Sequence, residues 1–178
     1  MRIIAGERKG HTIFAPKGLD TRPTSDRVRE NVFNIVAPWV EGARVLDLYA
    51  GSGAMGLEAL SRGAASAVFV EAEPQAVRAI ERNLDKLRLT GARIVRAGAT
   101  TGLAQEAAAG RKYDLVLVDP PYAMTDYDTL ARYLPRVLAD DGLLVLESSA
   151  RVEPELRGLA VRTTRKYGST RVTVFEHG

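Results

Sequence analysis

The chain has 178 residues, of which 46% are apolar and 26% are charged; this suits a globular domain and argues against intrinsic disorder. It has no cysteine and only two histidines, which excludes disulfides, thiolate zinc sites and iron–sulfur clusters and makes a histidine-based metal centre unexpected. The first residues are charged, and no stretch approaches the ~18 apolar residues of a membrane span, so we expect a cytoplasmic protein without a membrane segment.

The net charge of +3 is unevenly distributed along the chain. Residues 1–40 and residues 151–178 each carry +3, whereas residues 41–150 carry −3. Basic ends beside an acidic centre suit a polyanion held next to a separate pocket for a small ligand. An ordinary solvated surface would give the same pattern, so the charge alone leaves both interpretations open.

Residues 1–40 are predicted to form a short N-terminal extension. Residues 3–5 and 12–14 are expected to pair as a small hairpin. A polar approach follows, with Thr24 or Ser25 as the N-cap of a helix. Apolar residues at helical spacing between residues 28 and 36 predict the helix itself.

From residue 44 onward, short apolar runs alternate with helical patterns, which predicts an α/β domain with a mostly parallel sheet over residues 41–178. The expected strands of this sheet are residues 44–49, 66–71, 92–96, 113–119 and 143–147. The expected helices are residues 54–62, 74–89, 100–109 and 126–138. Residues 159–166 and 170–176 flank a short turn, which predicts an antiparallel hairpin that closes the sheet.

A glycine-rich turn follows the first predicted strand, in the sequence Leu46-Asp-Leu-Tyr-Ala-Gly-Ser-Gly-Ala-Met-Gly. Glycines let the backbone turn sharply and approach a ligand, and the next helix presents its unpaired N–H groups to that ligand. Glu71, at the end of the second strand, can accept both hydroxyls of a ribose. The candidate cofactor-binding residues here are Asp47, Tyr49, Ala50, Gly51, Ser52, Gly53 and Glu71.

These residues also match a different cofactor. Gly51, Gly53 and Gly56 satisfy the G-x-G-x-x-G dinucleotide fingerprint, and Glu71 supplies its acidic residue. A nicotinamide-nucleotide-binding protein and a glycine turn that only packs therefore remain alternatives on this evidence. A dehydrogenase would need a further substrate domain and a proton-transfer residue such as histidine, and the chain offers little room for either.

The fourth predicted strand ends in Val118-Asp-Pro-Pro-Tyr. Ligands of open α/β sheets bind at the carboxyl ends of central strands, so Asp119 is expected near the glycine-rich turn. Pro120 and Pro121 stiffen the chain and leave the Pro120 carbonyl to accept a hydrogen bond from a substrate. Tyr122 offers a ring on which a base can stack. These four residues are the candidate catalytic residues.

This set suits the exocyclic amine of an aromatic base, which is a poor nucleophile because its lone pair is delocalised. Asp119 and the Pro120 carbonyl can hold the amine hydrogens and aim the lone pair at a methyl donor. S-adenosyl-L-methionine is such a donor; its sulfonium is already activated, so positioning supplies much of the acceleration and no metal is required. Asp119 is expected to act first as an acceptor, since an unperturbed aspartate has a pKa of about 3.9.

Four blocks occur in order along the chain: Arg2-Ile-Ile-Ala-Gly, Thr21-Arg-Pro-Thr-Ser-Asp-Arg, the glycine-rich turn and Asp119-Pro-Pro-Tyr. Together they resemble the bacterial RsmD-type 16S ribosomal RNA guanine-N2 methyltransferases. The resemblance implies a Rossmann-like class I S-adenosylmethionine-dependent methyltransferase with a seven-stranded sheet. It implies methyl transfer to one guanine of 16S rRNA, within an assembling small subunit, with Asp47, Gly51 and Gly53 on the methionine side of the cofactor. A monomer is the default expectation.

The basic residues of the extension are the expected RNA contacts, through phosphates, and the resemblance places the Arg-Pro-Thr block near the active site. The candidates are Arg8, Lys9, Arg22, Pro23, Thr24, Arg27 and Arg29. Pairing of Arg27 and Arg29 with Asp26 or Glu30 on the helix surface is the alternative.

One region departs from the pattern of related methyltransferases, which often place a polar residue after the third strand to bind the adenine amine. This chain has Arg96-Ala-Gly-Ala-Thr there, so we expect backbone contacts from Gly98 and Ala99. Adenine in DNA and a glutamine amide in a protein would suit the same two acceptors, and both remain alternative substrates.

Overall fold

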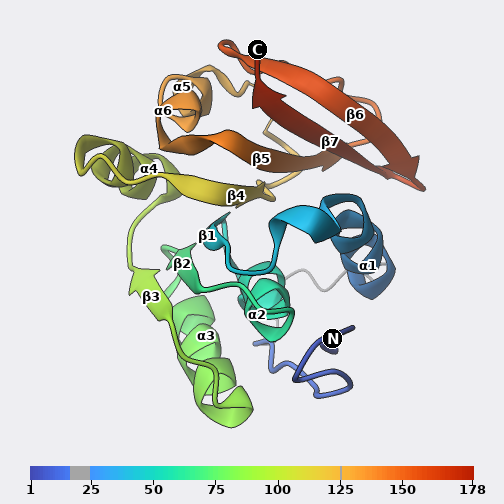
Figure 1. Cartoon of the computed structure of the whole chain (residues 1–178), viewed down its shortest axis with the longest axis vertical. Coiled ribbons are helices and arrows are strands. Elements are labelled where there is room, and N and C mark those ends of the chain that lie inside the picture. The colour runs from blue at the N-terminus through green and yellow to red at the C-terminus, as the bar shows by residue number, and fades with distance from the viewer. Residues whose placement is uncertain (17–24, 125) are drawn as a thin grey trace.

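The computed structural model describes residues 1–16, 25–124 and 126–178 (Figure 1). Across these residues the chain forms a seven-stranded sheet of order β3-β2-β1-β4-β5-β7-β6. The parallel strands are β1 (Arg44–Leu48), β2 (Ser66–Val70), β3 (Ala92–Val95), β4 (Tyr113–Val118) and β5 (Leu138–Ser149). The antiparallel hairpin consists of β6 (Leu159–Tyr167) and β7 (Thr170–His177). The predicted fold class is confirmed.

Helices cover both faces of the sheet, as Figure 1 shows. One face packs against α1 (Ser25–Val36), the 3-10 turn η1 (Ala37–Trp39), α2 (Ala54–Ser61) and α3 (Pro74–Leu87). The other face packs against α4 (Ala99–Ala108), α5 (Asp128–Ala131) and α6 (Leu134–Val137). In the described part of the chain, no helix is both long enough and apolar enough to cross a bilayer.

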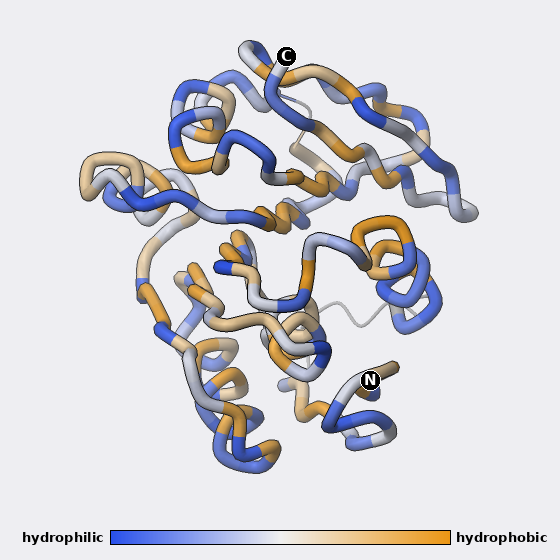
Figure 2. The backbone as a smooth tube through the Cα atoms, in the orientation of Figure 1, coloured by the Kyte–Doolittle hydropathy of each residue, from blue (hydrophilic) through white to orange (hydrophobic). Residues whose placement is uncertain are grey.

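The central strands are apolar on both faces because both faces are covered. In β4, Leu115 and Leu117 belong to the cluster under α1, α2 and α3, whereas Val116 and Val118 belong to the cluster under α4, α5 and α6. Figure 2 shows the same arrangement, with hydrophobic strand segments in the interior and hydrophilic segments outside. An uninterrupted apolar run is typical of such a doubly covered strand.

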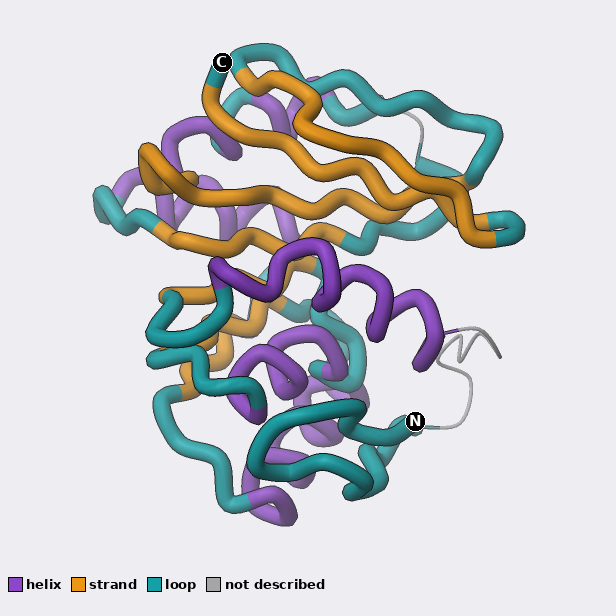
Figure 3. Tube along the Cα trace, turned by 45° about the vertical axis from the view of Figure 1, so that its right-hand side comes forward, coloured by secondary structure: helices purple, strands orange, loops and turns teal. Residues whose placement is uncertain are grey.

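Residues 1–16 form a loose hairpin that packs against the main domain (Figure 3). Strand pairing is limited to one antiparallel bridge between Arg2 and Thr12, so the predicted pairing of 3–5 with 12–14 is shifted. Ile3 and Ile13 are buried in the same cluster as α1 and the sheet. The N-terminal extension and the main domain therefore share one hydrophobic core. The division at residue 40 stays a prediction about function, since packing does not separate the two parts.

The segment before β5 differs from the sequence-based prediction. One helix was expected over residues 126–138, but Pro135 lies in the first turn of α6 and divides the segment into two short helices. A proline has no N–H for the preceding turn, so it begins a helix more readily than it continues one. The strand expected at residues 143–147 begins at Leu138 and includes Gly142, where a turn was expected.

Candidate active site

The glycine-rich turn connects the carboxyl end of β1 to the first turn of α2. Gly53 has a φ of +86° directly before α2, a conformation that side chains with a Cβ rarely adopt. Its amide donates to the Ala50 carbonyl at 2.8 Å and closes the turn. Tyr49 also has a positive φ, of 58°, which is an uncommon conformation for a bulky residue. The backbone therefore reverses at the edge of the sheet within five residues.

Asp47 lies beneath this turn and is 2% exposed. The Gly56 amide, in the first turn of α2, donates to Asp47 Oδ2 at 2.9 Å. Burial raises the pKa of Asp47 well above its ordinary value, the Gly56 hydrogen bond opposes that rise, and the negative charges of Asp119 and Glu71 add to it. Asp47 therefore lies near the carboxylates that follow the two neighbouring strands, β2 and β4.

Glu71 follows β2 and holds the glycine-rich turn in place. Its Oε1 accepts the Gly51 amide at 2.7 Å, and its Oε2 accepts the Glu73 amide at 2.9 Å. A carboxylate has about four acceptor positions, so each oxygen retains one for a ligand hydroxyl. Within the described residues, no group of three or more acidic or histidine side chains could hold a metal ion.

Asn83 is a site residue that sequence reasoning missed. It is fully buried in α3, and its amide donates to the Ser52 carbonyl at 3.1 Å and to the Phe14 carbonyl at 2.9 Å. Its oxygen accepts the Phe14 amide at 2.8 Å. Asn83 therefore links the N-terminal segment to the glycine-rich turn. The available signal was an asparagine on the apolar stripe of α3, three residues after Ile80.

The loop after β4 lies beside the turn, since β4 pairs with β1. Asp119 is half-buried, Pro120 is buried and Pro121 is exposed; the Pro121 carbonyl accepts the Met124 amide at 2.9 Å. The loop has contacts on both sides. The Tyr49 hydroxyl donates to Met124 Sδ at 3.8 Å on the β1 side.

The Tyr122 hydroxyl lies on the other side of this loop. It forms a short hydrogen bond with the hydroxyl of Thr170, the first residue of β7. Asp119 and Tyr122 both have interaction partners within the chain. The loop that was predicted to be catalytic is thus held between the glycine-rich turn and the C-terminal hairpin.

The region after β3 lies at the same edge, because the Glu71 amide donates to the Val95 carbonyl at 3.1 Å. Gly98 is exposed and precedes α4, and Ala99 is the half-buried first residue of that helix. The structure therefore brings Gly98 and Ala99 to the edge that holds Glu71.

Arg29 was expected on the RNA surface, but it is 2% exposed and serves the interior. Its guanidinium bonds to Asp26 Oδ1 at 2.9 Å, to Glu58 Oε1 at 3.4 Å and, by a short hydrogen bond, to the Arg2 carbonyl. Arg29 does pair with Asp26, as in the alternative interpretation, but from a buried position rather than on the helix surface. Arg29 connects α1 to α2 and to the N-terminal segment. Because these contacts hold its side chain in the interior, Arg29 is no longer a candidate RNA contact.

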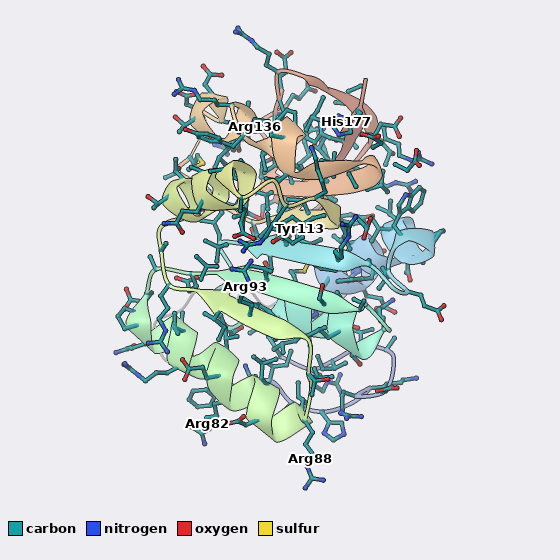
Figure 4. The ribbon with its side chains drawn as sticks, turned by 60° about the vertical axis from the view of Figure 1, so that its left-hand side comes forward. Arg82, Arg88, Arg93, Tyr113, Arg136 and His177 are labelled. Atoms are coloured by element: carbon teal, nitrogen blue, oxygen red, sulfur yellow. The ribbon has the colours of Figure 1, made fainter. Side chains whose placement is uncertain are left out.

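The other basic candidates lie on the surface or outside the described residues. Arg27 and Lys9 are exposed. Arg8 is partly exposed and donates to the carbonyls of Leu87 and Arg88 at the end of α3, where Arg88 points into solvent (Figure 4). Arg22, Pro23 and Thr24 lie outside the described residues. Ser25, the other predicted N-cap, is the first residue of α1.

Known proteins resemble this chain along almost its whole length. The family model described as Conserved hypothetical protein 95 matches residues 1–176. The "Putative rRNA methyltransferase YlbH" of Bacillus subtilis is 38% identical over 181 residues, covering 99% of this chain and 98% of that protein. The "Ribosomal RNA small subunit methyltransferase D" of Escherichia coli K12 is 40% identical over 156 residues, covering 88% and 75%. This chain belongs to the methyltransferase D family.

Solved structures agree with this placement. The "Putative methyltransferase yhhF from Escherichia coli" has a TM-score of 0.87 and 35% identity and covers 99% of this chain and 97% of that one. The Thermus thermophilus "16S rRNA N2 G1207 methyltransferase (RsmC) in complex with AdoMet and Guanosine" has a TM-score of 0.73 at 22% identity over 91% and 45%, which shows the fold alone. The predicted family and its class I methyltransferase fold are confirmed.

Proposed function

We propose that the chain transfers a methyl group from S-adenosyl-L-methionine to the exocyclic N2 amine of a guanine in 16S rRNA, within an assembling small subunit. The observation that carries the proposal is geometric: β1 lies between β2 and β4, and Leu48 of β1 pairs with both Val70 and Val118. Glu71 and Asp119, the residues that follow Val70 and Val118, therefore lie at the same edge of the sheet as Asp47 and the glycine-rich turn. The rRNA methyltransferase names of the two relatives support RNA as the substrate.

The residues at this edge of the sheet suit a cationic nucleoside better than a dinucleotide. A pyrophosphate needs free amides at a helix N-terminus, but the Gly56 amide of α2 already donates to Asp47. The three carboxylates would repel a diphosphate, whereas the sulfonium and ammonium groups of S-adenosylmethionine would favour the ionised form of Asp47. Glu71 retains acceptor positions for the ribose hydroxyls, as its place after β2 predicts.

The bound cofactor would supply a methyl group already activated by its positively charged sulfur. Asp119 and the Pro120 carbonyl would accept the two hydrogens of the guanine amine and turn its lone pair toward that methyl group. Asp119 would then receive, or pass to water, the proton that the nitrogen loses as it gains the methyl group. The Tyr122 ring would hold the base by stacking, once the base has left its own stack.

The RNA would be held by the basic extension. Exposed Arg27 and Lys9 are suited to phosphate contacts, and Arg8 has part of its side chain at the surface. Arg22, Pro23 and Thr24 are proposed RNA contacts on the family resemblance of their block.

The test is methyl transfer from labelled S-adenosylmethionine to small ribosomal subunits from cells that lack this protein, followed by nucleoside analysis. We expect N2-methylguanosine in 16S rRNA, and none with Asp119→Asn, which keeps the shape of the side chain and removes its charge. Asp119→Asn should bind the cofactor within a few-fold of wild type. Label in adenine or in protein would refute guanine as the target. Binding of NAD in place of S-adenosylmethionine would refute S-adenosylmethionine as the cofactor.

A further inference from the structure

A second carboxylate, Glu147, lies one strand away from Asp119. The register of β4 and β5 pairs Val118 with Leu146, so the next residues along the two parallel strands, Asp119 and Glu147, lie side by side. Glu147 is 7% exposed, which is unusual for a glutamate. Burying a carboxylate is costly unless it is well paired, and buried carboxylates are found at binding and catalytic sites as well as in structural ion pairs.

The side chain of Glu147 belongs to the face of the sheet that packs on α1. Successive side chains in a strand point to opposite faces. Val145 lies in the cluster under α1, α2 and α3, and Leu146 lies in the cluster on the opposite face. Glu147 also pairs with Val172 of β7, which belongs to the same cluster as Val145. Glu147 therefore lies on the same face of the sheet as Val145. It lies near the carboxyl end of β5, beside the end of β4 that precedes Asp119.

Tyr122 crosses the end of β5 at this point. Its loop leaves β4, its hydroxyl reaches Thr170 on β7, and β5 lies between these two strands. Thr170 pairs with Ser149, two residues beyond Glu147, so Thr170 and Glu147 lie on the same face. Asp119, Tyr122 and Glu147 are therefore neighbours at the carboxyl ends of β4 and β5.

The hydrogen-bonding edge of guanine carries donors next to each other: the N2 amine and the N1–H. A carboxylate only accepts, so two neighbouring carboxylates match this edge. Adenine presents an acceptor at N1, which a carboxylate would repel. We propose, as an extension of the proposed function, that Glu147 accepts the guanine N1–H and determines the preference for guanine. Glu147 has an interaction partner within the chain, and its carboxylate has about four acceptor positions, so the N1–H would add to that partner.

The expected size of this preference follows from the burial of Glu147. A site built to bond a substrate N–H rejects the analogue that lacks it, because the buried group then faces an atom it cannot pair with. For a base that keeps the N2 amine and has an acceptor at N1, we expect kcat/KM to fall by about 100-fold or more.

The experiment uses small subunits reconstituted with 16S rRNA that carries either guanine or 2,6-diaminopurine at the target position. Diaminopurine keeps the N2 amine and replaces the N1–H with an acceptor. We expect wild type to prefer guanine by about 100-fold or more, and Glu147→Gln, whose amide can donate to N1, to shrink or reverse that ratio. Glu155→Gln makes the same change at an exposed position and should keep the wild-type ratio.

Two outcomes would overturn the assignment of Glu147. The first is a wild-type protein that methylates both bases equally well, a result that needs no variant to fold. The second is a Glu147→Gln variant that binds S-adenosylmethionine normally but keeps the wild-type ratio or loses both activities alike. Absence of methyl transfer to guanine by wild type would instead refute the proposed function, so the two failures are distinguishable.

Discussion

Replacing Gly56 with alanine tests how α2 is held against the sheet. An added Cβ would lie 2.4 Å from Cε1 and 2.8 Å from Cζ of Phe69, whose side chain is fully buried in β2. An ordinary contact begins at 3.4 Å, so the helix or the ring must move by about 1 Å. Overpacking of this kind costs ~1–3 kcal/mol, and the higher helix propensity of alanine returns at most ~1 kcal/mol. We expect Gly56→Ala to lower the free energy of unfolding by about 2 kcal/mol.

The assay is urea unfolding, with a rescue and a control. Phe69→Leu removes the ring atoms of the contact, so Gly56→Ala should cost less in that background than in wild type. Gly98→Ala is the matched control, because Gly98 has a φ of −60° and no atom within 4 Å of its added Cβ. An unchanged unfolding midpoint for Gly56→Ala, or an equal cost in both backgrounds, would show that α2 does not depend on this close approach.

Three further outcomes concern ligands. Glu71→Ala should weaken S-adenosylmethionine binding by roughly 10- to 100-fold in calorimetry, because it removes the ribose acceptor and the bond to Gly51; an unchanged affinity would place the ribose elsewhere. The pKa of Asp47 is raised in the folded chain, so its contribution to stability is present at low pH and is lost as pH rises through that pKa. A cation favours the charged form, so cofactor affinity should rise with pH across the same range and flatten in Asp47→Asn; a fall with pH would contradict this. Arg27→Ala should weaken RNA binding and reduce its salt slope by about one unit, while a purely structural role would lower stability and leave that slope intact.

The fold was largely predictable because each strand and helix carries its own local pattern. β4 is an apolar run long enough to be central, and β1, β2 and β3 lie within a residue or two of their predicted ends. The main errors came from one proline and one glycine. Pro135 lies within a helical pattern and divides it, and Gly142 lies inside β5, where Asp141-Gly142 suggested a turn.

The candidate site was predictable only where its residues follow strand ends. Asp47, Glu71 and Asp119 could be placed together because parallel strands end at a common edge. Asn83 could not be placed, since its importance comes from packing between elements distant in sequence. Glu147 ends the strand expected at residues 143–147, but its burial and its register beside the end of β4 become visible only in the folded sheet. Arg29 shows the same limit in reverse: an arginine on a polar helical pattern gives no indication that Glu58, 29 residues away, draws it into the interior.

The contacts of residues 1–16 also determine when this segment can fold during synthesis. The Ile4 amide bonds to Glu58 and the Arg8 side chain to Leu87, so the partners lie 54 and 79 residues further along the chain. At a translation rate of ~5–20 residues per second, the segment waits on the order of ten seconds for α2 and α3 to emerge. During that interval Ile3 and Ile13 have no hydrophobic core to pack into. Residues 1–16 are therefore synthesised before the glycine-rich turn but complete their packing after it.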